Sequence, residues 1–122
     1  EMNFYNLNKK RIKIFWANKK DKWNISEIRK IFKNKNVYIT FDVDGFDSSL
    51  MPATGTPEPG GMFWNDVMPI LKNVCLVSNV VGADINELAP IKKFNSCNFL
   101  TAKLAYKIIS YVFESKLKYL GR

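Results

Sequence analysis

Residues 37–47 read Val-Tyr-Ile-Thr-Phe-Asp-Val-Asp-Gly-Phe-Asp, and a loop rich in glycine, proline and threonine follows at 52–61. The first five residues are β-branched or aromatic, which is typical of a β-strand. Their apolar character favours a parallel strand that is covered on both faces. The chain is therefore expected to contain a buried strand that ends at two acidic residues, Asp42 and Asp44.

Periodic segments before this strand predict one more strand and one helix. Residues 12–16 alternate and then run apolar, which favours a strand. From Trp23 onward, isoleucine and phenylalanine recur at helical spacing as far as Phe32, with lysine and arginine on the other side. This helix is expected to end before Asn36.

The residues after the glycine pair at 60–61 predict a helix, a strand and a final helix. Asn65 is the expected N-cap of the first helix, which would leave Pro69 near its first turn. A largely apolar strand is expected at 77–85. The last helix runs from about Phe99, and its predicted buried stripe consists of Leu100, Leu104, Ala105, Ile108, Ile109 and Val112.

Strands and helices that alternate in this way predict an α/β fold with parallel strands and right-handed crossovers. A chain of 122 residues without internal repeats has room for one domain. Three strands are few for a sheet of this kind. The chain is therefore expected to form one end of a larger sheet that has a neighbour at its edge or on its face.

Composition excludes some functional classes and leaves others open. No apolar run reaches the ~18 residues of a membrane span, and no signal-peptide pattern is present. Cys75 and Cys97 have no metal-site spacing and are too few for a disulfide framework, which fits a reduced, cytoplasmic setting. The net charge of +8 invites nucleic-acid binding, but lysine spread among asparagine, isoleucine and phenylalanine also arises from biased codon usage. No nucleic-acid or membrane partner is expected.

Three acidic residues could converge at one edge of the predicted sheet. Asp42 and Asp44 point to the same side of their strand, where two carboxylates repel unless a cation or shared proton lies between them. A hard divalent metal binds such oxygens, although Asp-x-Asp pairs also cap turns and helices. Glu87 follows the next strand, and ligands gather beyond the carboxyl ends of parallel strands. The alternative for Glu87 is a solvated residue before the turn at Pro90.

Several linked motifs resemble those of the ureohydrolase family, which contains arginase, agmatinase and formimidoylglutamase. The resemblance runs from about Ile12 to Phe113, and the final helix is most similar to bacterial agmatinases. Two departures are Ser48, where the family usually has proline, and Pro69 inside a helical pattern. The matching segments are Phe41-Asp42-Val43-Asp44-Gly45, Pro52-Ala53-Thr54-Gly55-Thr56-Pro57, Gly60-Gly61 and residues 80–90.

The resemblance implies a fold, a reaction and residue roles. The fold would be the C-terminal part of a three-layer α/β/α arginase-like fold with a mainly parallel sheet. The reaction would be hydrolysis of a guanidino compound by two Mn²⁺ ions that share an activated water, with agmatine giving putrescine and urea. Asp42 would bridge the two metals, Asp44 would bind one of them, Glu87 would pair with the substrate guanidinium, and Thr56 would lie close to it. No catalytic residue separate from the metal site is implied.

Alternatives remain open for these residues and for the whole chain. Thr56 could be only a turn hydroxyl, and Asp47 and Asp84 are expected to be structural. The family completes its metal site with two histidines and two further aspartates from upstream segments, and this chain contains no histidine. Residues 1–122 are therefore expected to be the C-terminal portion of a single ureohydrolase domain, inactive alone, whose partner is the missing upstream half or other subunits of an oligomer. The competing hypothesis is a non-catalytic module that docks on a full-length ureohydrolase.

Overall fold

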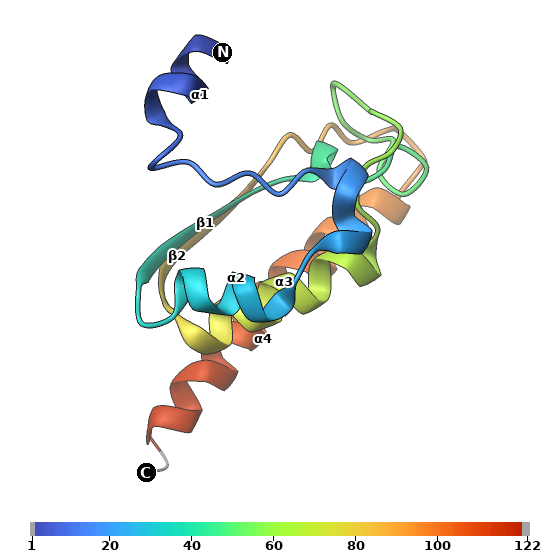
Figure 1. The fold of residues 1–122 in the computed structure, drawn as a ribbon. Helices are drawn as coiled ribbons and strands as arrows, with labels where there is room; N and C mark the ends of the chain where they lie inside the picture. Colours follow the sequence, from blue (N-terminus) through green and yellow to red (C-terminus); the bar gives the residue numbers. More distant parts are fainter. Residues whose placement is uncertain (1, 121–122) are drawn as a thin grey trace.

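The computed structural model describes residues 2–120, with side chains described for residues 3–117. A short helix and a 3-10 turn come first, and helices and strands then alternate from residue 25 onward (Figure 1). The elements are α1 (Met2–Asn8), η1 (Ala17–Lys22), α2 (Ile25–Phe32), β1 (Asn36–Asp42), η2 (Val43–Gly45), α3 (Trp64–Val77), β2 (Asn79–Asn86) and α4 (Ser96–Leu120).

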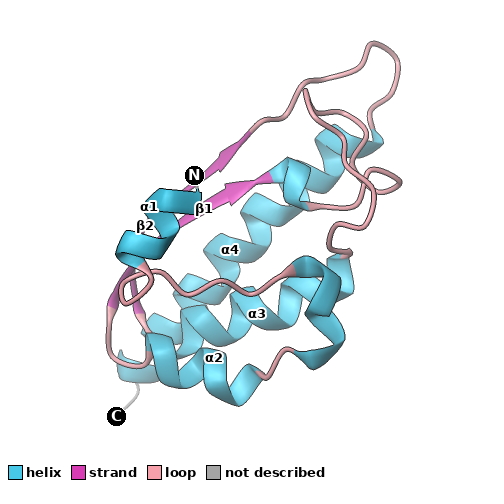
Figure 2. Ribbon diagram, turned by 45° about the horizontal axis from the view of Figure 1, so that its top comes forward, coloured by secondary structure: helices cyan, strands magenta, loops and turns pink. Residues whose placement is uncertain are grey.

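Strands β1 and β2 pair in parallel, from Asn36 opposite Asn79 to Asp42 opposite Asn86, with an irregularity after Val37. Helix α3 lies between them in the chain, as a parallel crossover requires (Figure 2). The predicted strands at 37–41 and 77–85 are thus confirmed, the second beginning two residues later than expected. This parallel arrangement confirms the predicted α/β class.

The core lies between one face of this sheet and helices α3 and α4. Ile39 and Phe41 of β1 pack there, together with Leu71 of α3 and Leu104 and Ile108 of α4. The opposite face of β1 carries Tyr38, Thr40 and Asp42, which are all exposed. The prediction that β1 is covered on both faces is therefore wrong for the described residues, because they place packed helices against one face only.

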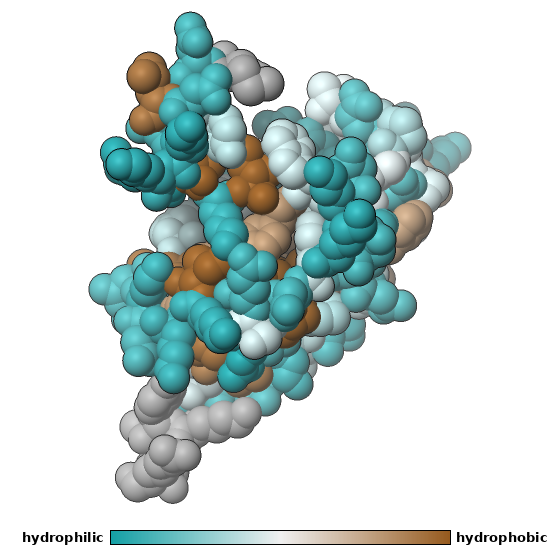
Figure 3. Space-filling model, in the orientation of Figure 1, coloured by the Kyte–Doolittle hydropathy of each residue, from teal (hydrophilic) through white to brown (hydrophobic). Residues whose placement is uncertain are grey.

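The strand predicted at 12–16 does not form. A strand requires a hydrogen-bonded neighbour, and the described part of the chain pairs β1 with β2 alone. Instead, the Trp16 carbonyl accepts a hydrogen bond from Trp23 Nε1 at 3.1 Å, and the Phe15 ring packs edge-on against Trp23. A mainly apolar cavity of about 360 Å³ lies between this segment, α2 and β1, where brown apolar side chains are visible in Figure 3.

Helix α3 begins two residues earlier than its sequence suggests. The expected N-cap, Asn65, lies inside the helix, and the cap is Phe63, whose backbone N–H donates to Asp66 Oδ2 at 2.8 Å. Pro69 consequently lies in the second turn rather than the first. The Asp66 carboxylate outweighs the capping propensity of Asn65 because it accepts an otherwise unpaired N–H at the positive end of the helix dipole.

Helices α2 and α4 follow the predicted patterns with one exception. Asn24 caps α2 by accepting hydrogen bonds from the backbone N–H groups of Ser26 and Glu27, and Ile28 is buried. In α4, Leu104 and Ile108 are buried as expected. Ile109 is 56% exposed, because it borders a groove between α4 and β2 that no other part of the described chain covers. Among residues 2–120, no helix combines the length and apolar character needed to cross a bilayer.

Candidate functional site

Asp42 and Asp44 lie together where β1 ends and η2 begins. Asp42 is the last residue of the strand, and its Oδ1 accepts a hydrogen bond from the backbone N–H of Asp44 at 3.4 Å. The pKa of Asp42 is raised, first by partial burial of its carboxylate and then by the negative charge of Asp44, while the Asp44 N–H opposes the rise. The pair therefore both caps the turn and concentrates negative charge, so the two interpretations of Asp-x-Asp are compatible.

The loop at 48–61 carries Thr56 back to this pair. Thr56 Oγ1 donates a hydrogen bond to Asp44 Oδ2 at 2.7 Å. The same loop is anchored in the core by Met51 and Ala53, which are almost fully buried. Thr56 therefore contacts one of the two carboxylates, and its role beside a substrate stays a prediction.

Glu87 lies at the same edge of the sheet, directly after the residue that pairs with Asp42. The register sets Asn86 opposite Asp42, and the backbone of Glu87 has a φ of 65°, an uncommon left-handed conformation for a glutamate. A hydrogen bond of 2.8 Å from the Ala89 N–H to the Ala53 carbonyl ties this segment to the loop that carries Thr56. The fold thereby brings the four predicted site positions to one end of the sheet.

The residues present fit a metal ion only in part. Among the described residues, no three His, Cys, Asp or Glu side chains gather closely enough to hold a metal, so Glu87 does not form a ligand cluster with Asp42 and Asp44. The two aspartates supply hard oxygen donors of the type that Mn²⁺ or Mg²⁺ accepts. Two carboxylates are too few for a complete ligand set, so a metal ion bound here would need further ligands.

A polar strip continues from Asp42 along the exposed face of the sheet and consists of Thr40, Asp84 and Asn86. Of these residues, Asp84 was expected to be structural. Asp84 accepts hydrogen bonds from Thr40 Oγ1 at 2.7 Å and from Asn86 Nδ2. Hydrogen bonds from Thr40 and Tyr38 lower the pKa of Asp84, which keeps it ionised. The sequence pattern could have predicted this contact, because Thr40 and Asp84 occupy the same face and the same register position of paired strands.

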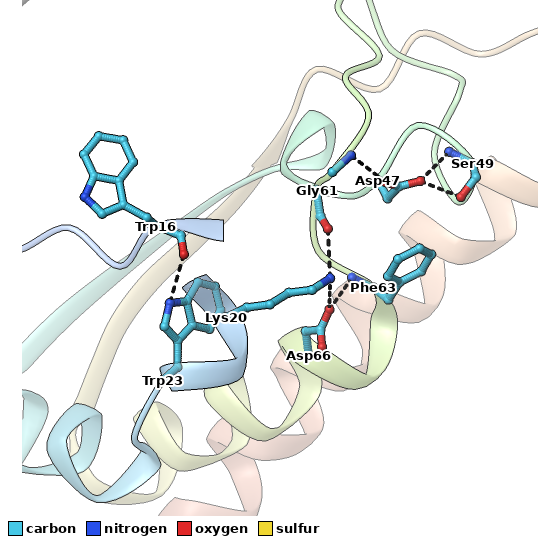
Figure 4. A network of polar contacts seen from close by, with 9 residues as sticks. Trp16, Lys20, Trp23, Asp47, Ser49, Gly61, Phe63 and Asp66 are labelled. Atoms are coloured by element: carbon cyan, nitrogen blue, oxygen red, sulfur yellow. Dashed lines mark hydrogen bonds and ion pairs between the residues drawn. The ribbon is translucent and has the colours of Figure 1, made fainter. Parts of the chain in front are cut away.

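Lys20, in the N-terminal segment, binds the Gly61 end of the loop at 48–61. Figure 4 shows Lys20 reaching from η1 to the start of α3. Its Nζ lies 2.8 Å from Asp66 Oδ2, 3.1 Å from the Gly61 carbonyl and 4.8 Å from the centre of the Phe63 ring. Lys20 is the main cause of the lowered pKa of Asp66. The loop is thus held at its Gly61 end by a partly buried ion pair, which sequence spacing alone did not reveal.

Comparison with known proteins identifies the family of this chain. The model of the arginase family matches residues 1–113. The chain belongs to the arginase family. Its α/β fold is arginase-like: it superimposes with a TM-score of 0.79 on 91% of its length with proclavaminate amidino hydrolase from Streptomyces clavuligerus, at 19% identity.

Similar relatives of this arginase-family chain include hydrolases of guanidino compounds. It is 38% identical over 115 residues to N(1)-aminopropylagmatine ureohydrolase of Synechocystis sp., covering 92% of the chain. It is 44% identical to the agmatinase of Chromobacterium violaceum over 66 residues, 54% of the chain and 20% of that protein. The agmatine ureohydrolase of Thermoplasma volcanium superimposes with a TM-score of 0.76 at 28% identity, covering 96% of the chain and 40% of the other protein.

The chain spans only part of these relatives. Its match covers 37% of the Synechocystis protein and 40% of the Thermoplasma structure. The comparisons establish the family and the fold. Because the match is partial, the roles of Asp42, Asp44, Thr56 and Glu87 stay predictions.

Proposed function

We propose that this chain supplies part of the active site of a manganese-dependent ureohydrolase, with agmatine as the substrate and putrescine and urea as the products. The observation that carries the proposal is the contact between Thr56 Oγ1 and Asp44 Oδ2 at the end of β1, beside Asp42. It links the acidic pair to the Gly/Pro loop in an arginase-family fold. The buried, unpaired thiols of Cys75 and Cys97 suit a reducing, cytoplasmic compartment.

In this proposal Asp42 and Asp44 hold manganese, and the rest of the ligand set comes from outside the chain. When bound, the metal ions supply a water of lowered pKa and positive charge beside the attacked carbon. The carboxylates of Asp42 and Asp44 contribute the negative charge that offsets the cations, and the Thr56 hydrogen bond fixes the direction of one of them.

Glu87 binds the substrate in this proposal. A carboxylate can hold a guanidinium by two parallel charge-assisted hydrogen bonds, which fix its plane relative to the metal-binding aspartates. The left-handed backbone at Glu87 supports this role, because such conformations in non-glycine residues are found at functional sites more often than elsewhere. Thr56, on the loop that meets this segment through Ala53 and Ala89, lies beside the bound guanidinium.

The partner in this proposal is the remaining part of a ureohydrolase domain, on the same or another chain. Two apolar surfaces support it: the cavity beside β1, and a groove along the other edge of the sheet between β2 and α4 that is lined by Ala83, Ile85 and Ile108. The exposed stripe of α4 continues the second surface through Phe99, Tyr106, Ile109, Phe113 and Leu117. Unpaired strand edges with apolar surroundings are sites where further strands add.

The test is a chimera in which this chain replaces the matching segment of the Synechocystis relative. We expect Mn²⁺-dependent urea release, greatest with agmatine when agmatine, N(1)-aminopropylagmatine and arginine are compared. Asp42→Asn should lower kcat/KM at least about 100-fold, because even residues outside a metal's ligand set cost roughly 10–100-fold. Asp21→Asn, at an exposed position on η1, is the matched control and should change little.

Two outcomes distinguish the proposal from its competitor. A folded chimera that releases no urea from any of these guanidino compounds would overturn the hydrolase function. Tight binding of the 122-residue chain to an intact ureohydrolase, with neither urea release nor Mn²⁺ binding in the chimera, would favour the non-catalytic docking module instead.

A further inference from the structure

The carboxylate of Asp47 gathers the two ends of the loop at 48–61. Its Oδ1 accepts hydrogen bonds from the backbone N–H of Ser49 at 2.9 Å and from the Ser49 hydroxyl. Its Oδ2 accepts the backbone N–H of Gly60 at 2.8 Å, thirteen residues away. One side chain thus bonds to both the outgoing and the returning end of the loop.

The returning end is shaped to meet this carboxylate. Gly60 has a φ of +83°, a conformation that glycine adopts without steric cost. At Gly61 an added Cβ would lie 2.5 Å from the backbone nitrogen of Asp47, so the two chain segments pass in direct contact. The Asp47 N–H donates to the Met62 carbonyl at 2.9 Å, which fixes the same crossing from the backbone side.

The opposite end of the loop carries the site contact. Thr56 lies between the two anchored ends, and its hydroxyl donates to Asp44 Oδ2 at 2.7 Å. The segment from Gly55 to Gly60 is exposed, so little packing holds it in place. Its position therefore depends on bonds at its base, of which the Asp47–Gly60 bond is charge-assisted and hence the stronger kind.

We infer that Asp47 is a positioning residue: by holding the Gly60 end of the loop against the end of β1, it sets Thr56 on Asp44 and so orients the acidic pair. The inference rests on the proposed function for its catalytic consequence, but the coupling from Asp47 to Thr56 is a property of this chain alone.

The test measures the loop in the full 122-residue chain by NMR. In Asp47→Asn, an amide NH₂ or a weaker carbonyl oxygen faces the Gly60 N–H. We expect Gly60 amide exchange to accelerate about 10-fold or more, and the Thr56 methyl and amide resonances to shift. Resonances of Ile39 and Val80, in the paired strands, should stay in place. Ser49→Ala is the matched control, because it removes one hydroxyl bond and keeps the carboxylate on Gly60.

The outcomes separate this inference from the proposed function. If Gly60 responds in Asp47→Asn while Thr56 does not, Asp47 only closes its own turn and the inference is overturned. If Asp47→Asn fails to fold, Asp47→Glu keeps the charge but displaces the bond, and an unmoved Thr56 would again overturn it. In an active chimera, Asp47→Asn should lower kcat/KM clearly more than Ser49→Ala does, and equal effects would refute the positioning role. A chimera without activity leaves the NMR result standing as the test.

Discussion

Gly61 and Asp47 show how single residues near the site depend on one another. The chain returns so closely past Asp47 that only a glycine fits at residue 61, and the carboxylate of Asp47 then binds the next residue back, Gly60. Because the approach is between backbone atoms, no side-chain adjustment can relieve a clash there. The residues that carry Thr56 to Asp44 are therefore constrained by contacts some distance from either.

Replacement of Gly61 by alanine should destabilise the fold. The added methyl group would lie 2.5 Å from the Asp47 nitrogen, and relief requires movement of the loop base, at a cost of about 1–3 kcal/mol. Urea unfolding followed by circular dichroism gives the change in free energy of unfolding. Gly55→Ala is the control, since no atom lies within 4 Å of its added Cβ. Equal stability of the two variants would show that the crossing at residue 61 is not tight.

The contribution of Asp47 to stability should depend on pH. Hydrogen bonds from Ser49 and Gly60 lower the pKa of Asp47 in the folded chain below its unfolded value of about 3.9. Its charge therefore stabilises the fold above that unfolded value, and the effect is lost as pH falls through the folded pKa. Asp47→Asn should lower the melting temperature at pH 7, and the difference from the unmodified chain should shrink as pH falls below the unfolded value of about 3.9, with Asp21→Asn as control. A difference that stays the same on both sides of that value would contradict this cause.

Helix α4 shows at the scale of one element how burial and exposure divide a helix. Leu104 is fully buried against the sheet and α3, whereas Ile109, five residues later, is 56% exposed on a stripe with Tyr106 and Phe113. An apolar stripe of this length on the outer side of a helix is unusual for a surface exposed to water. The helix therefore has one face that stabilises this chain and another that is suited to a neighbour.

Alanine substitutions on the two faces of α4 should differ strongly in the isolated chain. Leu104→Ala leaves a cavity and should lower the free energy of unfolding by about 2–5 kcal/mol. Ile109→Ala removes exposed surface and should change it by less than about 0.5 kcal/mol. Urea denaturation of both variants is the measurement. A large loss in Ile109→Ala would show that another surface covers the stripe in solution.

In the part of the molecule that the structure describes, the core lies between one sheet face and its helices, and the reactivity of Cys75 reports on whether that core is intact. Its side chain is fully buried in α3, and the second cysteine, Cys97, is also buried at the start of α4. Burial raises the pKa of the Cys75 thiol to about 11. Its reactivity therefore depends on opening of the whole fold rather than on local exposure.

Thiol labelling should be slow in the folded chain. At pH 8 the raised pKa alone reduces the reactive thiolate of Cys75 roughly 100-fold relative to an ordinary cysteine, and burial adds a steric barrier. The Cys97→Ser variant keeps Cys75 as its remaining cysteine. Its reaction with an aromatic disulfide reagent is followed by the change in absorbance. The rate in concentrated urea is the reference. Labelling of the folded chain at the unfolded rate would show that the core around α3 is open.

The sequence by itself determined the α/β class, the strands β1 and β2, the helical faces that bury Ile28 and Leu104, and membership of the arginase family. The class, the strands and the helical faces follow from local patterns, because hydrophobic periodicity depends on neighbours in the chain. The family was indicated by the resemblance of several linked motifs, and the family model confirms it. The placement of Asp42 and Glu87 at one end of the sheet was also within reach, since parallel strands end at a common edge. The position of Thr56 near this edge was implied only by the family resemblance.

Only the tertiary structure decided the features that depend on contacts between distant residues. Segment 12–16 has the pattern of a strand but pairs with no strand among the described residues, and it packs on Trp23 instead. The start of α3 depends on Asp66, which Lys20 holds from another element. The exposure of Ile109 and the bond from Asp47 to Gly60 likewise depend on what lies opposite each residue in space. Sequence periodicity gives the face on which a side chain lies, whereas tertiary packing determines whether anything covers that face.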